Sequence, residues 1–160
     1  MAKNLQTILK NITHGVYVIS VYDEGEKNAF TAAWVMQVSF DPLLICFSIN
    51  PKHRSYSLLQ RGNVCCISVL NNKQFKIANH FGQSTPDKML AYRWLETKTG
   101  APALAESLAY FDCCVDKFST AGDHEIVLCK VINAEILTPG NPMLYGDTGD
   151  MDSSSALYKK

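Results

Sequence analysis

The sequence has 160 residues, which is the length of a single domain, because chains divide into separate cores only at larger sizes. Hydrophobic residues make up 47% and charged residues 19%, so the chain can close a core, and a disordered chain is excluded. The formal net charge is zero, which argues against nucleic acid and against an anionic membrane surface as partners. Any anionic ligand must therefore be held by a local site.

Most of the predicted elements are strands, with helices between them. Apolar and β-branched runs predict strands at 15–22, 29–39, 43–49, 64–70, 108–118 and 125–137. Helical spacing predicts helices at 5–11, 52–60 and 73–81. A further helix is expected to begin at Thr85-Pro86, with Thr85 as N-cap, and Gly62 is expected to end the second helix.

This order of elements predicts a mainly β fold, in which adjacent hairpins form an antiparallel barrel interrupted by short helices. There is no internal repeat and no linker, so we expect one domain over 1–148. The remaining residues, 149–160, are rich in serine and charge and are expected to be a tail that frays unless a partner holds it.

Six cysteines raise the question of disulfide bonds. They lie in or beside apolar β-type segments, and no signal-peptide pattern precedes Gly15. The longest clean apolar run, 43–47, has the length of a buried strand and is too short for a membrane span. We therefore expect free thiols in a cytoplasmic chain.

The strand expected at 29–39 has two different faces. Its even positions are mostly bulky and apolar and are expected to pack in the core: Phe30, Ala32, Trp34, Met36, Val38 and Phe40. Its odd positions are mostly small or polar: Ala29, Thr31, Ala33, Val35, Gln37 and Ser39. Because successive side chains point to opposite faces, the shallow odd face would let a flat ligand lie close to the backbone. An ordinary half-exposed strand remains the alternative.

The segment 48–56 runs from a strand into a helix start and gathers basic side chains. Arg54 and Ser55 open the helix, and Lys52 and His53 precede them. Free amide groups at a helix N-terminus together with a guanidinium can form a phosphate site. A solvated basic first turn is the alternative, and this segment alone does not decide between the two.

Gly122-Asp123-His124 lies between the two long strands, where His124 is either a donor near the edge of a ligand or a turn residue. No metal site is predicted. Cys65-Cys66 and Cys113-Cys114 lack the two-residue gap that lets both sulfurs reach one zinc ion, and the four histidines show no ligand spacing. The sequence also lacks a glycine-rich phosphate loop and a dinucleotide fingerprint.

Several stretches together resemble the flavin reductase-like, FMN-binding split-barrel family. The stretches that carry the resemblance are 13–19, 28–34, 38–42, 48–56, His80-Phe81-Gly82 and Gly122-Asp123-His124. Their order and spacing, from about Thr13 to Leu137, make the combined signal stronger than any single piece. The resemblance implies an antiparallel split barrel that forms a homodimer with one FMN per subunit near the dimer interface.

The resemblance also assigns roles to residues. Those expected to line the isoalloxazine ring and the ribityl chain are Thr31, Ala32, Ala33 and Trp34, and Ser39 would bond polar atoms of the flavin. Those expected to hold the ribityl chain and phosphate are Ser48, Ile49, Asn50, Arg54, Ser55 and Tyr56. Phe81 and Gly82 would close one side. His124, the candidate catalytic residue, would lie near the redox edge, where a nicotinamide could stack.

The function implied is an NAD(P)H-dependent flavin oxidoreductase, which transfers a hydride to FMN and passes electrons on to a second acceptor or a partner oxygenase. FMN is expected rather than FAD or riboflavin. A non-enzymatic electron-transfer flavoprotein with tightly bound FMN and a redox partner protein is the first alternative. A barrel that has lost its flavin and serves as a binding module is the second.

Overall fold

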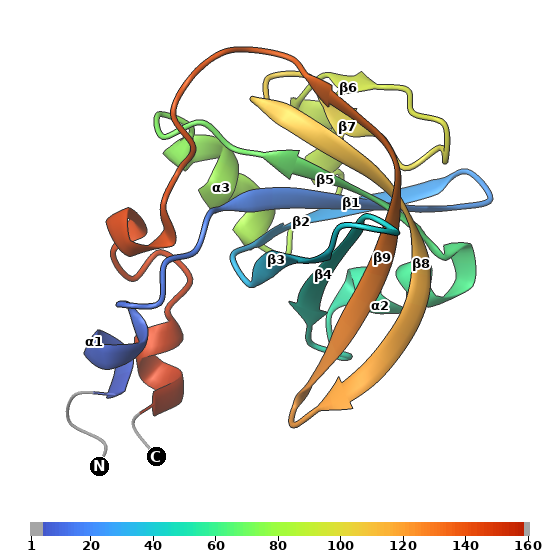
Figure 1. Cartoon of the computed structure of the whole chain (residues 1–160). Coiled ribbons are helices and arrows are strands. Elements are labelled where there is room, and N and C mark those ends of the chain that lie inside the picture. Colours follow the sequence, from blue (N-terminus) through green and yellow to red (C-terminus); the bar gives the residue numbers. More distant parts are fainter. Residues whose placement is uncertain (1–4, 159–160) are drawn as a thin grey trace.

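The computed structural model describes residues 5–158, and its main element is a curled seven-stranded sheet (Figure 1). The strands of this sheet are β1 (Tyr17–Asp23), β2 (Glu26–Ala32), β3 (Val35–Ser39), β4 (Leu44–Ile49), β5 (Val64–Val69), β8 (Ala109–Ala121) and β9 (His124–Ile136). Their order is β2-β1-β5-β8-β9-β4-β3, and each neighbouring pair is antiparallel. The two short strands β6 (Trp94–Leu95) and β7 (Ala103–Leu104) form a separate ribbon.

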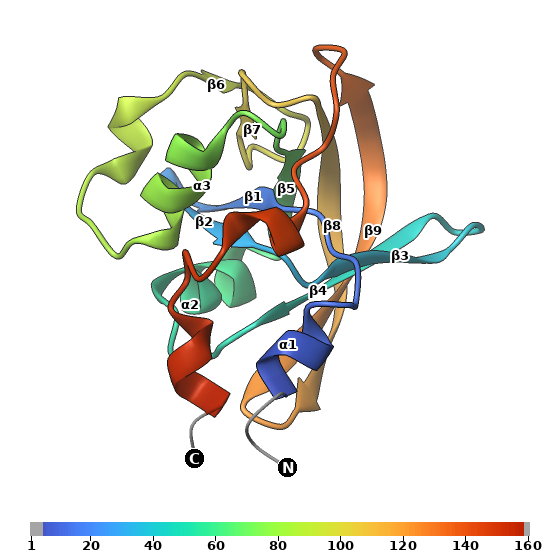
Figure 2. The same ribbon diagram turned by 90° about the vertical axis from the view of Figure 1, so that its left-hand side faces the viewer.

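Short helices pack around this sheet (Figure 2). The α-helices are α1 (Leu5–Leu9), α2 (Arg54–Gly62) and α3 (Phe75–Gly82), and the 3-10 helices are η2 (Lys88–Ala91), η3 (Tyr145–Thr148) and η4 (Ser154–Tyr158). Both α2 and α3 pack against β1 and β2. Within residues 5–158, no helix has the length and apolar character needed to cross a membrane.

Strand β1 is buried on both faces and separates two hydrophobic cores. Ile19 and Val21 point into the barrel core, which they share with Phe47 and Leu59. Val18 points the other way, into a second cluster that we call the α3 core, formed by Val16, Val18, Ala29, Leu70, Ile77, Ala78, Phe81, Leu104 and Met143. A strand buried on both sides needs a nearly continuous apolar run, and this explains the composition of 16–21.

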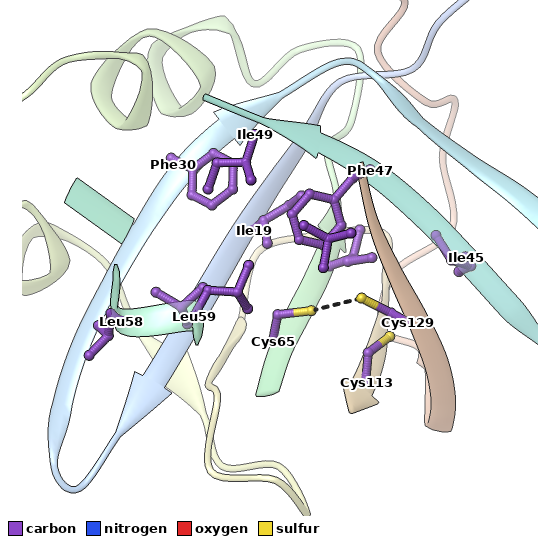
Figure 3. Close-up of a cluster of buried hydrophobic side chains, with 13 residues drawn as sticks. Ile19, Phe30, Ile45, Phe47, Ile49, Leu58, Leu59, Cys65, Cys113 and Cys129 are labelled. Atoms are coloured by element: carbon purple, nitrogen blue, oxygen red, sulfur yellow. Dashed lines mark hydrogen bonds between the residues drawn. The ribbon is translucent and has the colours of Figure 1, made fainter. Parts of the chain in front are cut away.

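Three cysteines belong to the barrel core rather than to any reactive surface (Figure 3). The sulfur atoms of Cys65 and Cys129 lie 3.7 Å apart, and Cys113 points into the same space. All six cysteines are free thiols. Burial raises the pKa of Cys66, and hydrogen bonding to neighbouring thiols followed by burial raises that of Cys65, so these groups stay protonated and pack as small apolar side chains.

The strand predicted at 29–39 is in fact two strands separated by residues 33–34. The amide of Val35 donates to the Ala33 carbonyl at 3.1 Å, and the amide of Ser48 donates to the Trp34 carbonyl at 3.1 Å. The chain therefore leaves β1 at the end of β2 and joins β4 as β3. Because β2 and β3 are the two edges of the sheet, residues 33–34 span the split of the barrel.

The core prediction for the even positions of this segment was wrong beyond Ala32. Phe30 is 4% exposed, but Trp34 is 47%, Met36 62% and Phe40 90% exposed. The physical reason is that β3 and β4 form a hairpin that projects beyond the barrel, where nothing in residues 5–158 covers its outer side (Figure 2). The odd face differs from the prediction as well, because Ala29 is buried in the α3 core and a cavity is lined by both even and odd positions of 30–34. Alternation could not show which side chains are covered.

Two helix boundaries also differ from the prediction. No helix begins at Thr85; the chain instead reaches η2 at Lys88 through Asp87, whose φ of 53° is left-handed. Helix α2 ends at Gly62 as expected, but its left-handed cap is Asn63, whose amide donates to the Leu59 carbonyl. The reason for glycine at 62 is a close approach to β1.

Replacing Gly62 tests this close approach. A Cβ at position 62 would lie 1.8 Å from the Tyr22 carbonyl oxygen, so alanine must push α2 away from β1. This cost exceeds the gain of about 1 kcal/mol from better helix propensity, and we expect Gly62→Ala to lower the free energy of unfolding by about 2 kcal/mol or more. Urea denaturation measures it. Gly82→Ala, at the end of α3 with open space around its Cβ, is the matched control. Equal midpoints for the two variants would contradict the close approach.

Candidate functional site

A cavity of about 320 Å³ lies where the two edges of the sheet meet. Its walls come from the end of β2, residues 33–34, the end of β4, helix α3 and the C-terminal segment. The residues that line it are Val16, Phe30, Thr31, Ala32, Ala33, Trp34, Ser48, Ile49, Asn50, His53, Ala78, Asn79, Phe81, Gly82, His124, Tyr145, Met151, Asp152, Ser154, Leu157 and Tyr158. Such a mainly apolar concave site with a few polar groups is typical of a small-molecule binding site.

Hydrogen bonds between elements fix the wall formed by β2. The Thr31 hydroxyl donates to the Ala78 carbonyl of α3 at 2.6 Å. The amide of the buried Asn28 side chain donates to the Ser55 hydroxyl of α2 at 3.0 Å. These bonds join both helices to one strand, so the small side chains at 32 and 33 are held at a fixed place on the cavity wall.

His124 and Trp34 form an aromatic pair that lines the cavity. Their ring centroids are 5.3 Å apart with a tilt of 59°. Nδ1 of His124 lies 2.8 Å from the Asp123 carboxylate, which can only accept when ionised, so Nδ1 donates and Nε2 is left free. This hydrogen bond also lowers the pKa of Asp123. The carboxylate therefore orients the imidazole ring.

Basic groups gather beside the start of α2. Burial, and then the charge of Lys88, lower the pKa of His53, while burial and the charge of Arg54 lower the pKa of Lys88. The ion pairs found within residues 5–158 involve Arg61 and His124, so Arg54 and Lys88 have no carboxylate partner in the part of the chain described. Cations that repel one another without a counter-ion form a place for an anion.

His53 has a second role at this point. Its Nδ1 accepts from the Ser55 amide at 3.2 Å and thereby caps α2, and its ring packs against Phe30 with centroids 4.9 Å apart. A nitrogen that accepts carries no proton, so in the neutral ring Nε2 carries it and can donate to a ligand. Lys88 is 7% exposed and donates to the Gln83 carbonyl at 3.2 Å.

The structure brings together most of the residues predicted for the site. Those that line the cavity are Thr31, Ala32, Ala33, Trp34, Ser48, Ile49, Asn50, Phe81, Gly82 and His124. They come from four separate segments of the chain. Their meeting depends on the break at 33–34, which carries the chain from one sheet edge to the other.

The remaining predicted residues lie outside the cavity wall. Ser39 is at the far end of β3, paired with Leu44. Ser55 is buried and bonded to Asn28. Tyr56 accepts a hydrogen bond from Gln60 and packs on Phe118, and Arg54 belongs to the cationic group just described.

Several parts of the site were missed from the sequence, among them His53 and Tyr145, which both line the cavity. Lys88 was not predicted as a site residue because 85–88 was interpreted as a helix start. A lysine that follows proline and aspartate could have been noted as a second cation beside Arg54. The exposed polar face of α3 contributes Asn79. The C-terminal segment contributes Met151, Asp152, Ser154, Leu157 and Tyr158. These residues were missed because the serine-rich sequence around them is typical of a tail.

A curled antiparallel sheet has an apolar cavity at its split, an aromatic pair on the cavity wall and a basic group at its edge. These features fit a flat organic ligand. Comparison with known proteins identifies the class further. Residues 9–153 match the family described as the flavin reductase like domain. The chain belongs to this family, as the resemblance predicted.

Individual relatives agree with the family. The chain is 28% identical, over 89% of its length and 73% of the relative's, to the reductase subunit HsaB of a flavin-dependent monooxygenase from Rhodococcus jostii. It is 28% identical to an FMN reductase (NADH), RutF 1, from Methylorubrum extorquens, over 87% of this chain and 70% of the relative. A solved NADH:FAD oxidoreductase of Streptomyces globisporus, in complex with NAD and FAD fragments, superposes with a TM-score of 0.83 at 27% identity, covering 90% of this chain and 87% of that one.

These findings confirm the predicted split-barrel fold class and the enzyme class, a flavin oxidoreductase. They favour the enzyme over the electron carrier and the flavin-free binding module. Flavin, when bound, supplies the two-electron chemistry, and the residues of the chain supply its position and surroundings. The small side chains at 32 and 33 and the apolar wall fit a flat ring system.

Enlarging Ala33 tests whether the cavity takes the flavin. Ala33 lines the cavity but belongs to neither hydrophobic core, so leucine there fills ligand space without disturbing packing. We expect Ala33→Leu to weaken flavin binding by about tenfold or more, because the larger side chain occupies space that the ring system needs. The melting temperature should stay within about 2 °C of wild type. Ala134→Leu, on an exposed position of β9, is the matched control. Equal losses of flavin affinity and melting temperature would show that Ala33 is a core residue.

Proposed function

We propose that this protein reduces FMN with NADH and releases the reduced flavin to a partner oxygenase. The observation that carries the proposal is a cavity with two features: the basic group of His53, Arg54 and Lys88 at its edge, of which His53 lines the wall, and the His124–Trp34 pair on the wall. The first feature fits the phosphate of FMN, and the second fits a stacking and orienting surface for a nicotinamide. RutF 1, an FMN reductase (NADH), supports the reduction of FMN by NADH. HsaB, the reductase subunit of a flavin-dependent monooxygenase, supports the partner oxygenase.

The preference for FMN rests on the cationic group. Riboflavin lacks the phosphate, so it would gain nothing from His53, Arg54 and Lys88. A charge-assisted hydrogen bond contributes about 1.5–3 kcal/mol, which is enough to separate the two flavins clearly in affinity. The amides of α2 beyond the His53 cap add further donors for a phosphate.

The other walls of the cavity would position the flavin and exclude water from it. Backbone and small side chains at 31–33 would lie against the ring system, and Ser48 to Asn50 would bond the ribityl hydroxyls. Phe81 closes the side formed by α3. His124, held by Asp123, would orient the nicotinamide or support charge on the flavin, because hydride transfer requires alignment of the two rings first.

We also propose a homodimer, with the second copy covering the outer face of β3, β4 and β9. Met36 pairs with Cys46, and Cys46 pairs with Leu128, so their side chains share one face of the sheet. Ile126 extends this apolar face and is 41% exposed. Exposed apolar area of this kind marks an interface, and Trp34 connects it to the cavity. Free thiols throughout support a cytoplasmic location.

Lys88 provides the first test. Lys88→Met removes one cation from the proposed phosphate site while keeping an unbranched side chain of similar reach. We expect FMN affinity to fall about ten- to a hundredfold and riboflavin affinity to stay within about threefold. Titration monitored by flavin fluorescence measures both. Lys76→Met, the same change on the exposed side of α3, is the control. Equal weakening of both flavins in Lys88→Met would place the phosphate elsewhere.

His124 provides the second test. Without oxygen, NADH should bleach the flavin absorbance of the wild-type protein in stopped flow. His124→Ala should slow this step by about ten- to a hundredfold, the scale of one lost positioning contact, with FMN affinity within a few-fold of wild type. A wild-type protein that binds FMN but is not reduced by NADH or NADPH would overturn the proposed reaction. An unchanged rate of flavin reduction in His124→Ala would contradict only the proposed positioning role of His124 and not the proposed reaction.

A further inference from the structure

Residues 149–158 fold back over the cavity instead of leaving the barrel. After η3 the chain crosses beside β2 and ends in η4 next to α1 (Figure 2). Met151, Asp152, Ser154, Leu157 and Tyr158 all line the cavity. Leu157 is at the same time 74% exposed, so this segment separates the cavity from solvent with no second layer above it.

One tether of this segment is Tyr145. The Tyr145 hydroxyl donates to the Asp152 carboxylate at 2.8 Å and lies 3.2 Å from the Ser154 hydroxyl. The ring packs against the α3 core, and the Tyr145 amide donates to the His14 carbonyl at 2.9 Å. Tyr145 is therefore fixed to the barrel on one side and holds residues 152–154 on the other.

A second tether lies around Asp150. Its carboxylate accepts from the amide and the hydroxyl of Ser155, which closes the turn before η4. Gln6 donates to the same carboxylate at 3.4 Å, and the Lys10 ammonium donates to the Gly149 carbonyl at 2.9 Å. These contacts are polar and exposed, and neither α1 nor η4 has a fully buried residue.

Elements held by exposed polar contacts, without buried apolar area, open at little cost in free energy. Residues 149–158 come close to this case: Met151 is half-buried and packs against the α3 core, while their other tethers are the exposed polar contacts above. They also lie between the ligand cavity and solvent. The β2, β4 and α3 walls of the cavity are all fixed by core packing, so they cannot widen its opening for a flavin that enters and leaves during each cycle. The C-terminal segment is the wall that can move.

We propose that residues 149–158 form a movable wall of the flavin cavity and that Tyr145 is the positioning residue that holds this wall closed. Opening of the wall sets the rate of flavin dissociation. This inference rests on the proposed function, because it requires the flavin to occupy the cavity.

The test measures the dissociation rate of oxidised FMN from the full-length protein, by diluting the FMN-loaded protein into flavin-free buffer and following the recovery of free-flavin fluorescence. Tyr145→Phe keeps the ring but loses the hydroxyl that holds Asp152 and Ser154. We expect dissociation about five- to tenfold faster, the scale of one lost hydrogen bond at an exposed position. Asp150→Ala loosens the other tether and should change the rate in the same direction.

Tyr92→Phe is the matched control. Tyr92 also packs against the α3 core, but its hydroxyl makes no hydrogen bond within residues 5–158. This variant should release FMN at the wild-type rate. The melting temperatures of all three ligand-free variants should lie within about 2 °C of wild type, because the segment buries little. Amide hydrogen exchange of 149–158 should slow when FMN binds.

Different failures have different meanings. If Tyr145→Phe and Tyr92→Phe release FMN equally fast, or if FMN leaves exchange of 149–158 unchanged, the movable wall is overturned while the proposed function stands. If wild-type protein binds no FMN, or if Ala33→Leu binds it as well as wild type, the placement of flavin in this cavity fails and both proposals fall.

Discussion

The site depends on one constraint: the two edges of the sheet, β2 and β3, are joined by only residues 33–34. These residues cannot belong to both ladders, so the barrel stays split at this point and a cavity forms beside the break. Small side chains at 32 and 33 keep the split open for a ligand. Trp34, the first residue on the far side, meets His124 because β3, β4 and β9 are consecutive in the sheet.

Rigidity around the split comes from β1. Because β1 is buried on both faces, the barrel core and the α3 core lie on its two sides and share it. Gly62 lets α2 approach this strand, and α3 joins β2 through Thr31 and Ala78. The cavity walls that carry the proposed flavin contacts are therefore attached to elements that pack in the two cores.

Alternation predicted the main strands, because it follows from local order, and the family resemblance predicted ten of the 21 residues that line the cavity. Alternation could not predict the exposure of Met36 and Phe40, since a bulky apolar face looks the same whether it meets the core or a second subunit. Lys88 was missed because its role depends on neighbours brought in by tertiary packing, Arg54 and His53. Periodicity contains no information about such contacts.

In the proposed function, the affinity for the flavin and its dissociation rate depend on different groups. Burial, and then the charge of Arg54, lower the pKa of Lys88. In the proposed function, the phosphate of the flavin would offset this repulsion between the two cations. The wall at 149–158 adds the half-buried Met151 and otherwise exposed polar contacts, so it costs less to open than the core-packed walls. Affinity and exchange rate in the proposed function therefore depend on different parts of the chain: the first on the basic group beside the cavity, the second on Tyr145 and its partners.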